Sequence, residues 1–113
     1  MGKISVRDIV FVSFPFSNLS DTKLRPALVL AYAQKNDWIL CQITSKSYSD
    51  IQAVRIDEDD FTWGTLERIS YVRLGKLFTA SEEVIVKNNI AALKEKTHQT
   101  IISAITDMLN NRE

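Results

Sequence analysis

The sequence predicts a mainly β protein that ends in one α-helix, folded as a small, strongly bent sheet or barrel. From residue 6 to about residue 93, short apolar stretches rich in β-branched and aromatic residues alternate with polar turns. After about residue 95 the apolar residues recur at helical spacing. A chain of 113 residues, 45% hydrophobic and 25% charged, has the size and composition of one globular domain with a substantial core.

The first strand is predicted at residues 6–14, a stretch dense in β-branched and aromatic residues that suits two partly covered faces. Pro15 ends this strand, and the polar residues 16–24 form a loop of a kind that often carries function. Pro26 fits the first position of the next strand, because a missing N–H is tolerated there.

The central feature is a long β-hairpin. Its two apolar strands, 25–32 and 38–45, are joined by the polar residues 33–37. If the strands pair antiparallel, Arg25 comes to the same end of the hairpin as Thr44 and Ser45. A permanent cation beside two hydroxyl groups is unusual at the end of a strand. These three residues are therefore the first candidate site.

The chain after the hairpin continues as β structure. A half-buried strand is predicted at residues 51–56, where apolar and polar residues alternate. The acidic residues 57–60 are interpreted as a solvated turn, with metal binding as the minor alternative. Residues 66–74 form another strand, which Gly75 breaks before it resumes at 76–79.

The last third of the chain changes from β to helical spacing. A brief helical turn is predicted at 81–83, and the segments 84–87 and 90–93 are one interrupted strand or two pieces. An amphipathic helix follows from about residue 95 to 110, with His98 on its polar side or edge as a solvated or packing residue. The apolar face of the helix consists of Ile101, Ile102, Ile105, Met108 and Leu109.

Bulk properties exclude several classes of protein. Fourteen basic and fourteen acidic residues give zero net charge, so nucleic-acid binding would need a local basic patch. The single Cys41 excludes an internal disulfide and is predicted to be a buried, unreactive thiol. One His and one Cys do not make a usual zinc site. No apolar stretch reaches membrane-spanning length and the start has no signal-peptide pattern, so a cytoplasmic protein without a membrane span, metal or cofactor is expected.

Several short motifs occur in a specific order along the chain. They are Asp8-Ile9-Val10, Phe14-Pro15-Phe16-Ser17, Arg25-Pro26-Ala27-Leu28-Val29-Leu30, Gln42-Ile43-Thr44-Ser45, and Ser70-Tyr71-Val72-Arg73 with Lys76-Leu77-Phe78. With this ordered set, the chain resembles the PemK/MazF family of toxin endoribonucleases from about residue 6 to residue 110. The Arg-Pro-Ala-Leu-Val-Leu run alone would be a weak signal, whereas the ordered set is fairly specific.

The resemblance implies a single domain over residues 1–113, folded as a small SH3-like β-barrel of the PemK/CcdB type with a C-terminal helix. It implies a homodimer that cuts single-stranded RNA at short sequences without a metal, and a cognate antitoxin whose peptide blocks the RNA groove. The family's catalytic arginine falls on Arg25 and its catalytic hydroxyl residue falls on Thr44.

The predicted chemistry follows from these side chains. Metal-free RNA cleavage uses the substrate's 2′-hydroxyl as the nucleophile, so the protein must stabilise charge on the phosphate and manage two protons. The guanidinium of Arg25 matches two phosphate oxygens, Thr44 can donate to a phosphate oxygen or orient the 2′-hydroxyl, and Ser45 assists. Further RNA-binding residues are predicted to be four cations that contact phosphates and two aromatic residues that stack on bases: Lys23, Lys46, Arg73, Lys76, Phe16 and Tyr48, with Trp63 as a weaker stacking candidate.

The sequence departs from the family pattern at two places. Arg7 stands where the family often has Gly, and the segment around Arg73 contains no carboxylate of the kind proposed as a base in some members. The general base is therefore unassigned. The alternative function is a non-catalytic binding module on the same scaffold. It would be a CcdB-like inhibitor of DNA gyrase that acts through the end of the C-terminal helix, or an inactive member that only binds a partner.

Overall fold

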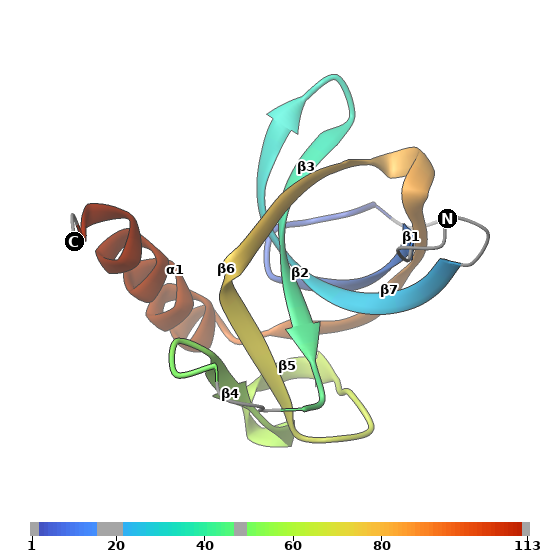
Figure 1. The fold of residues 1–113 in the computed structure, drawn as a ribbon. Coiled ribbons are helices and arrows are strands. Elements are labelled where there is room, and N and C mark those ends of the chain that lie inside the picture. Colours follow the sequence, from blue (N-terminus) through green and yellow to red (C-terminus); the bar gives the residue numbers. More distant parts are fainter. Residues whose placement is uncertain (1–2, 16–21, 47–49, 112–113) are drawn as a thin grey trace.

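The computed structural model describes residues 3–15, 22–46 and 50–111. Its seven antiparallel strands form one curled sheet in the order β4-β6-β3-β2-β1-β7-β5, and a single helix follows the last strand (Figure 1). This confirms the predicted mainly β architecture with a C-terminal helix. The strands are β1 (Asp8–Pro15), β2 (Thr22–Gln34), β3 (Asp37–Thr44), β4 (Val54–Ile56), β5 (Phe61–Gly64), β6 (Ser70–Ser81) and β7 (Ile85–Leu93), and the helix is α1 (Glu95–Asn110).

The central strands bury both of their faces. Neighbouring residues in a strand point to opposite faces of the sheet, so the alternating residues of β1 enter two separate cores. Ile9 belongs to a cluster that includes Ile101 and Ile105 from α1, whereas Val10 and Val12 belong to a second cluster on the other face. This arrangement explains why the sequence of β1 is apolar almost throughout, and it agrees with the prediction of two covered faces.

The first two strands differ from the prediction at their ends. β2 begins at Thr22, so Lys23 and Leu24 lie in a strand and not in the predicted loop. Pro26 is inside β2 instead of at its first position. It lies opposite Phe11 of β1, while the pairing with β3 starts one residue later at Ala27. The proline therefore stands where β2 has only one neighbouring strand, which is where a missing N–H is tolerated.

The strand β6 runs through Gly75 without ending, which corrects the predicted break. Its pairing with β3 passes from Leu77 opposite Cys41 to Val72 opposite Ile43. Two residues along β3 therefore correspond to five along β6, and the extra residues form a bulge at 73–76. A bulge does not end a strand, so Gly75 lies at an irregularity inside the continuous strand β6. The predicted start of this strand at residue 66 is also wrong, because β6 begins at Ser70.

The remaining elements follow the prediction with two corrections. β4 covers only Val54–Ile56 of the predicted 51–56, and the alternatives left open for 84–93 resolve into the single strand β7, with a bulge in its pairing to β1. The predicted brief helical turn is the 3₁₀ turn η2 (Glu82–Val84), with Ser81 as its N-cap. The acidic run forms a second such turn, η1 (Glu58–Asp60), with a capping box made by Asp57 and Asp60.

The helix α1 has the predicted bounds, and of the two alternatives for His98 the structure shows the packing residue, on the buried face and not on the polar side. Only 4% of His98 is exposed. β7 leads into the helix after a single residue, Lys94, so the first helical turn stays against the barrel. The amide of Leu93 donates to the carbonyl of Arg7, and Thr97 donates to Asp60, which hold this turn in place. His98 also stands at helical spacing from Ile101 and Ile105, so the helical pattern and this connection together place its imidazole on the buried face of α1.

Candidate active site

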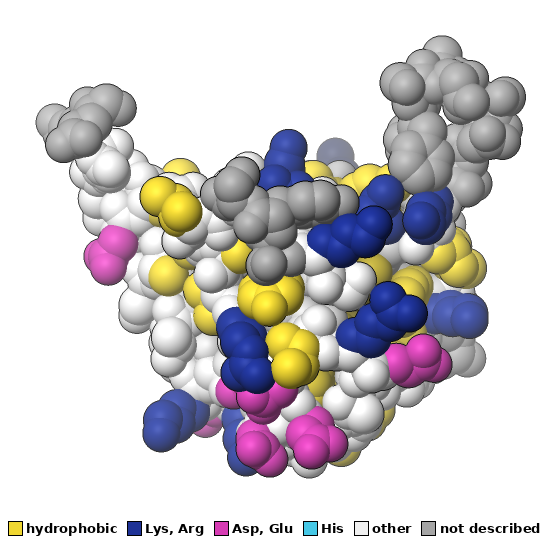
Figure 2. Space-filling view, turned by 60° about the horizontal axis from the view of Figure 1, so that its bottom comes forward, with side chains coloured by type: hydrophobic (Ala, Val, Ile, Leu, Met, Phe, Trp, Pro, Cys, Tyr) yellow, Lys and Arg dark blue, Asp and Glu magenta, His cyan; other side chains and the backbone are white. Residues whose placement is uncertain are grey.

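A cavity of about 580 Å³ lies at the end of the β2–β3 hairpin that is opposite to its tip. Five of its lining residues are basic, and none of them is acidic. The lining residues are Phe14, Lys23, Leu24, Arg25, Pro26, Gln42, Ile43, Thr44, Ser45, Lys46, Arg73 and Lys76. Figure 2 shows Lys and Arg side chains gathered on one face of the molecule. A protein with no net charge thus has a local basic site suited to an anion.

The hairpin brings Arg25 and Thr44 to the same end. The pairing of β2 with β3 reaches Ala27 opposite Gln42, and Arg25 on β2 and Thr44 on β3 each lie two residues beyond this pair. Both residues line the cavity, together with Ser45. The structure therefore brings together the guanidinium and the two hydroxyl groups that the sequence places at one end of the hairpin.

The hydroxyl oxygen of Thr44 also has a structural role. It accepts a hydrogen bond of 3.2 Å from the backbone N–H of Lys46, so it fixes the turn that leaves β3. A threonine hydroxyl that accepts one hydrogen bond keeps its own O–H for donation. Thr44 can therefore hold the local backbone and still offer a donor to an anion in the cavity.

The bulge of β6 brings Arg73 and Lys76 to the same cavity. The carbonyl of Arg73 accepts a hydrogen bond of 2.9 Å from the thiol of Cys41, which is fully buried. Burial raises the pKa of this thiol to about 12, and the charge of Asp50 adds to the effect. The prediction that Cys41 is buried is confirmed. Its raised pKa makes it a structural donor and not a nucleophile.

The fold supplies a carboxylate that the sequence around Arg73 lacks. Asp50 Oδ2 accepts a hydrogen bond of 2.9 Å from Arg73 Nε, within an ion pair between residues 23 positions apart. The hydrogen bond from Arg73 is the main cause that lowers the pKa of Asp50 below its ordinary value. The segment around Arg73 itself contains no carboxylate, and the one that meets it comes from a distant part of the sequence. No motif marks Asp50, because the contact depends on how these two distant segments meet.

Of the three aromatic residues predicted to stack on bases, only Trp63 lies in the part of the chain that the structure describes. Phe16 and Tyr48 lie outside the described residues. Trp63 does not line the cavity and stands on β5, at the opposite edge of the sheet from β4 and β6. Phe14, which was not predicted as a site residue, does line it and packs edge-on against Phe78 with ring centroids 4.9 Å apart. Of the predicted site residues, the structure gathers the following seven in one cavity: Lys23, Arg25, Thr44, Ser45, Lys46, Arg73 and Lys76.

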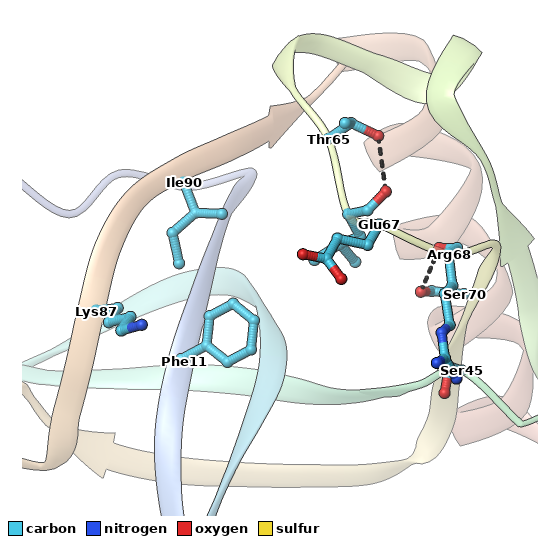
Figure 3. A pocket seen from close by; sticks show the side chains of 9 residues that line it. Phe11, Ser45, Thr65, Glu67, Arg68, Ser70, Lys87 and Ile90 are labelled. Carbon is cyan, nitrogen blue, oxygen red and sulfur yellow. Dashed lines mark hydrogen bonds between the residues drawn. The ribbon is translucent and has the colours of Figure 1, made fainter.

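A second cavity, of about 470 Å³, adjoins the first because Ser45 lines both. Its walls combine apolar residues with charged ones, and Figure 3 shows the carboxylate of Glu67 between Phe11 and Arg68. The lining residues are Phe11, Ser45, Thr65, Leu66, Glu67, Arg68, Ser70, Lys87 and Ile90. A lining that combines apolar and charged side chains suits a planar group that also carries hydrogen-bonding edges.

Two features are absent from the described residues. Among residues 3–15, 22–46 and 50–111 there is no group of three or more His, Cys, Asp or Glu side chains that could hold a metal ion. The acidic turn at 57–60 is included in this range, and the carboxylates of Asp57 and Asp60 serve capping and the hydrogen bond from Thr97. Within the same ranges, no helix has the length and apolar character needed to cross a membrane.

Fold and cavity together define the class of protein: a small, curled antiparallel barrel with a basic, hydroxyl-bearing anion site at one end of its central hairpin. The model of one protein family matches residues 5–109, and the description of that family is PemK-like, MazF-like toxin of type II toxin–antitoxin system. The chain belongs to this family. The resemblance inferred from the ordered motifs is thereby confirmed.

Solved structures support the same fold. The Mycobacterium tuberculosis toxin MazF-mt6 has 17% sequence identity and a TM-score of 0.70, over 95% of this chain and 100% of that chain. An endoribonuclease from a mycobacterial species, solved in complex with its cognate antitoxin, has 12% identity and a TM-score of 0.68, over 96% of both chains. A comparison with curated protein sequences gave no significant match.

Proposed function

We propose that this protein is the toxin of a toxin–antitoxin pair and inhibits growth as a metal-independent endoribonuclease that cuts single-stranded RNA at short sequences. The observation that carries the proposal is that Arg25 and Thr44 line the same cavity, at one end of the hairpin, together with four further basic residues. Membership of the MazF-like toxin family supports it. The likeness in fold to a mycobacterial endoribonuclease supports it as well.

The reaction that fits this site is an internal transfer on the RNA backbone. The 2′-oxygen attacks the adjacent phosphorus and loses its proton, while the bond from phosphorus to the 5′-oxygen breaks and that oxygen gains a proton. The products are a cyclic phosphate and a 5′-hydroxyl. Arg25 binds the phosphate oxygens as negative charge develops on them, Thr44 donates to the phosphate or orients the 2′-hydroxyl, and Ser45 assists.

The rest of the basic cavity binds the RNA backbone. Lys23, Lys46, Arg73 and Lys76 neutralise phosphates, which adds affinity without sequence preference. Phe16 and Tyr48 remain proposed stacking residues. The second cavity receives a base next to the cleaved bond, because Ser45 connects the two cavities and Phe11 offers an aromatic face.

Two partners are proposed besides RNA. The first is a cognate antitoxin that covers the basic cavity, in line with the neighbour that was solved with its antitoxin. The second is another copy of this chain in a homodimer. We further propose that the protein acts in the cytoplasm, where its RNA substrate is found, and that cleavage needs no cofactor.

The test uses purified protein and a long single-stranded RNA in excess chelator, with the 5′ ends of the products mapped. We expect discrete cuts at a shared short motif, and loss of these cuts in Arg25→Ala. Lys35→Ala is the matched control, because it removes the same charge from the tip of the same hairpin. Absence of cuts by folded protein, or equal cutting by Arg25→Ala, contradicts the proposal.

One observation favours the alternative of a non-catalytic inhibitor of DNA gyrase. Leu109 is 67% exposed in the last turn of α1, so the helix end presents an apolar side chain that could contact another protein. Deletion of residues 110–113 and the variant Leu109→Ser separate the two functions. The gyrase hypothesis predicts loss of toxicity, whereas the nuclease hypothesis predicts toxicity close to that of the wild type.

A further inference from the structure

Asp50 is held in a defined position by both of its carboxylate oxygens. Oδ2 accepts from Arg73 Nε at 2.9 Å, and Oδ1 accepts from the backbone N–H of Gln52 at 3.1 Å. The carbonyl of Asp50 also accepts from the N–H of Ala53 at 3.3 Å. The side chains of Asp50 and Arg73 are 19% and 26% exposed, so solvent screens this ion pair only in part.

Arg73 is likewise fixed at two points. Its carbonyl accepts the hydrogen bond from the buried thiol of Cys41, which anchors the bulge of β6 at this residue. Its Nε is bound to Asp50 at the other end of the side chain. A flexible side chain that is held at its backbone and near its tip has few remaining rotamers, so it is preorganised for binding.

The contact leaves the larger part of the guanidinium for a ligand. Nε carries one of the five N–H donors of an arginine, and the two Nη groups carry the other four. Arg73 lines the basic cavity, whereas Asp50 is not among the lining residues. Asp50 therefore binds the Nε–H of Arg73 without lining the cavity in which a phosphate group would bind.

We propose that Asp50 is a positioning residue, which holds the Arg73 guanidinium so that its Nη groups bind a second RNA phosphate beside the one bound by Arg25. The expected effect of Asp50 on the rate of RNA cleavage rests on the proposed nuclease function. Asp50 makes no contact with the reacting atoms in this role. It stays ionised at neutral pH, in keeping with its lowered pKa. The turn after β3 and the bulge of β6 thus become parts of one phosphate-binding unit.

The kinetic test compares Asp50→Ala, Asp50→Asn, Arg73→Ala and the double variant. Asp50→Ala should lower kcat/KM by about tenfold or more. A loss of this size is typical when a residue that orients a metal-binding side chain by a hydrogen bond is removed. Asp50→Asn should restore most of the activity, because the amide oxygen still accepts from Nε. In the Arg73→Ala background, Asp50→Ala should have no further effect. Asp59→Ala is the matched control, since Asp59 is an exposed carboxylate outside the basic cavity.

Two outcomes overturn the proposal. One is wild-type kcat/KM in both Asp50 variants, and the other is an Asp50→Ala effect that persists in the absence of Arg73. If Asp50 were a general base, the loss of activity in Asp50→Ala would persist without Arg73 and the pH–rate profile would change. If Asp50 were purely structural, the loss would also persist, and the variant would have a lower Tm. If Asp50→Ala fails to fold, kcat/KM is compared between Asp50→Asn and Arg73→Lys instead, because lysine lacks the Nε–H that Asp50 binds.

A second measurement does not depend on cleavage. The Arg73 Nε–H resonance should be protected from exchange in the wild type and should shift when inorganic phosphate is added. We expect protection to be lost in Asp50→Ala and the phosphate response to weaken. If the wild type neither cuts nor binds RNA, the nuclease proposal fails, and this titration still decides the role of Asp50. Equal phosphate responses in wild type and Asp50→Ala would contradict it.

Discussion

The two ends of the β2–β3 hairpin are built in opposite ways. At the tip, Lys35 and Asn36 form a two-residue turn with positive φ, and the N–H of Asn36 donates to the hydroxyl of Tyr32 at 3.0 Å. Tyr32 packs edge-on against Trp38, whose indole N–H donates to Glu82 at 3.0 Å. At the other end, the same two strands carry Arg25 and Thr44 into the basic cavity.

The difference shows that the tip of the hairpin stabilises the fold, whereas its open end carries the candidate site. The hydrogen bonds and ring contacts at the tip are made within the chain, so they stabilise the fold. At the open end, five basic residues line one cavity, and their mutual repulsion costs stability unless an anion binds. The proposed ligand-binding residues are therefore those at the open end, a pattern expected where function competes with stability.

The largest expected effect comes from the tip. Trp38→Ala removes a buried indole from the second core cluster, and we expect it to lower the free energy of unfolding by about 3–5 kcal/mol. Trp38→Phe keeps an aromatic ring but loses the hydrogen bond to Glu82, so it should cost only about 1 kcal/mol. Urea denaturation measures both values. Equal stability of the two variants would show that packing at the tip contributes little.

A smaller effect, on rate and not on stability, is expected at the open end. Thr44→Val removes the donor proposed to act on the phosphate and should lower kcat about 100-fold or more. Its stability should fall by no more than about 1 kcal/mol, from loss of the hydrogen bond to Lys46. Thr79→Val is the control, because Thr79 is an exposed threonine on β6 near the tip. RNA cleavage by Thr44→Val at the rate of Thr79→Val would rule out the catalytic role.

His98 gives a test of stability that involves neither end of the hairpin. Burial and the nearby charge of Arg7 lower the pKa of His98 in the folded protein. The unfolded chain then binds a proton more readily, so stability is complete above the unfolded pKa of about 6.5 and is lost as pH falls below it. We expect the difference in unfolding free energy between wild type and His98→Gln to change between pH 7.5 and pH 5.5, to the disadvantage of the wild type. A constant difference would mean that His98 titrates normally in the fold.

The smallest expected effect separates two contacts of the tip. Tyr32→Phe keeps the ring that packs on Trp38 but removes the hydroxyl that accepts from Asn36. Because this hydrogen bond is exposed, we expect a loss of about 0.5–1 kcal/mol. RNA cleavage should be unchanged, since the tip lies at the far end of the strands from Arg25. A change in cleavage rate would mean that the two ends are coupled.

Local pattern was sufficient for much of the fold and for the centre of the site. The apolar runs on both sides of 33–37 predicted the hairpin, and antiparallel pairing alone brought Arg25 to Thr44. The helix was predicted over its observed length because the apolar residues of α1 recur at helical spacing after the β pattern ends. These features depend on residues close together in the sequence, where periodicity and pairing rules apply directly.

The sequence by itself therefore determined the strand-rich barrel, the C-terminal helix, and the cation beside two hydroxyl groups. Only the tertiary structure decided the bulge at 73–76 and the contact of Asp50 with Arg73. Each of these depends on how segments distant in the sequence meet. A register shift between two strands leaves no periodic signal in the residues concerned, because it is set by packing across the whole barrel.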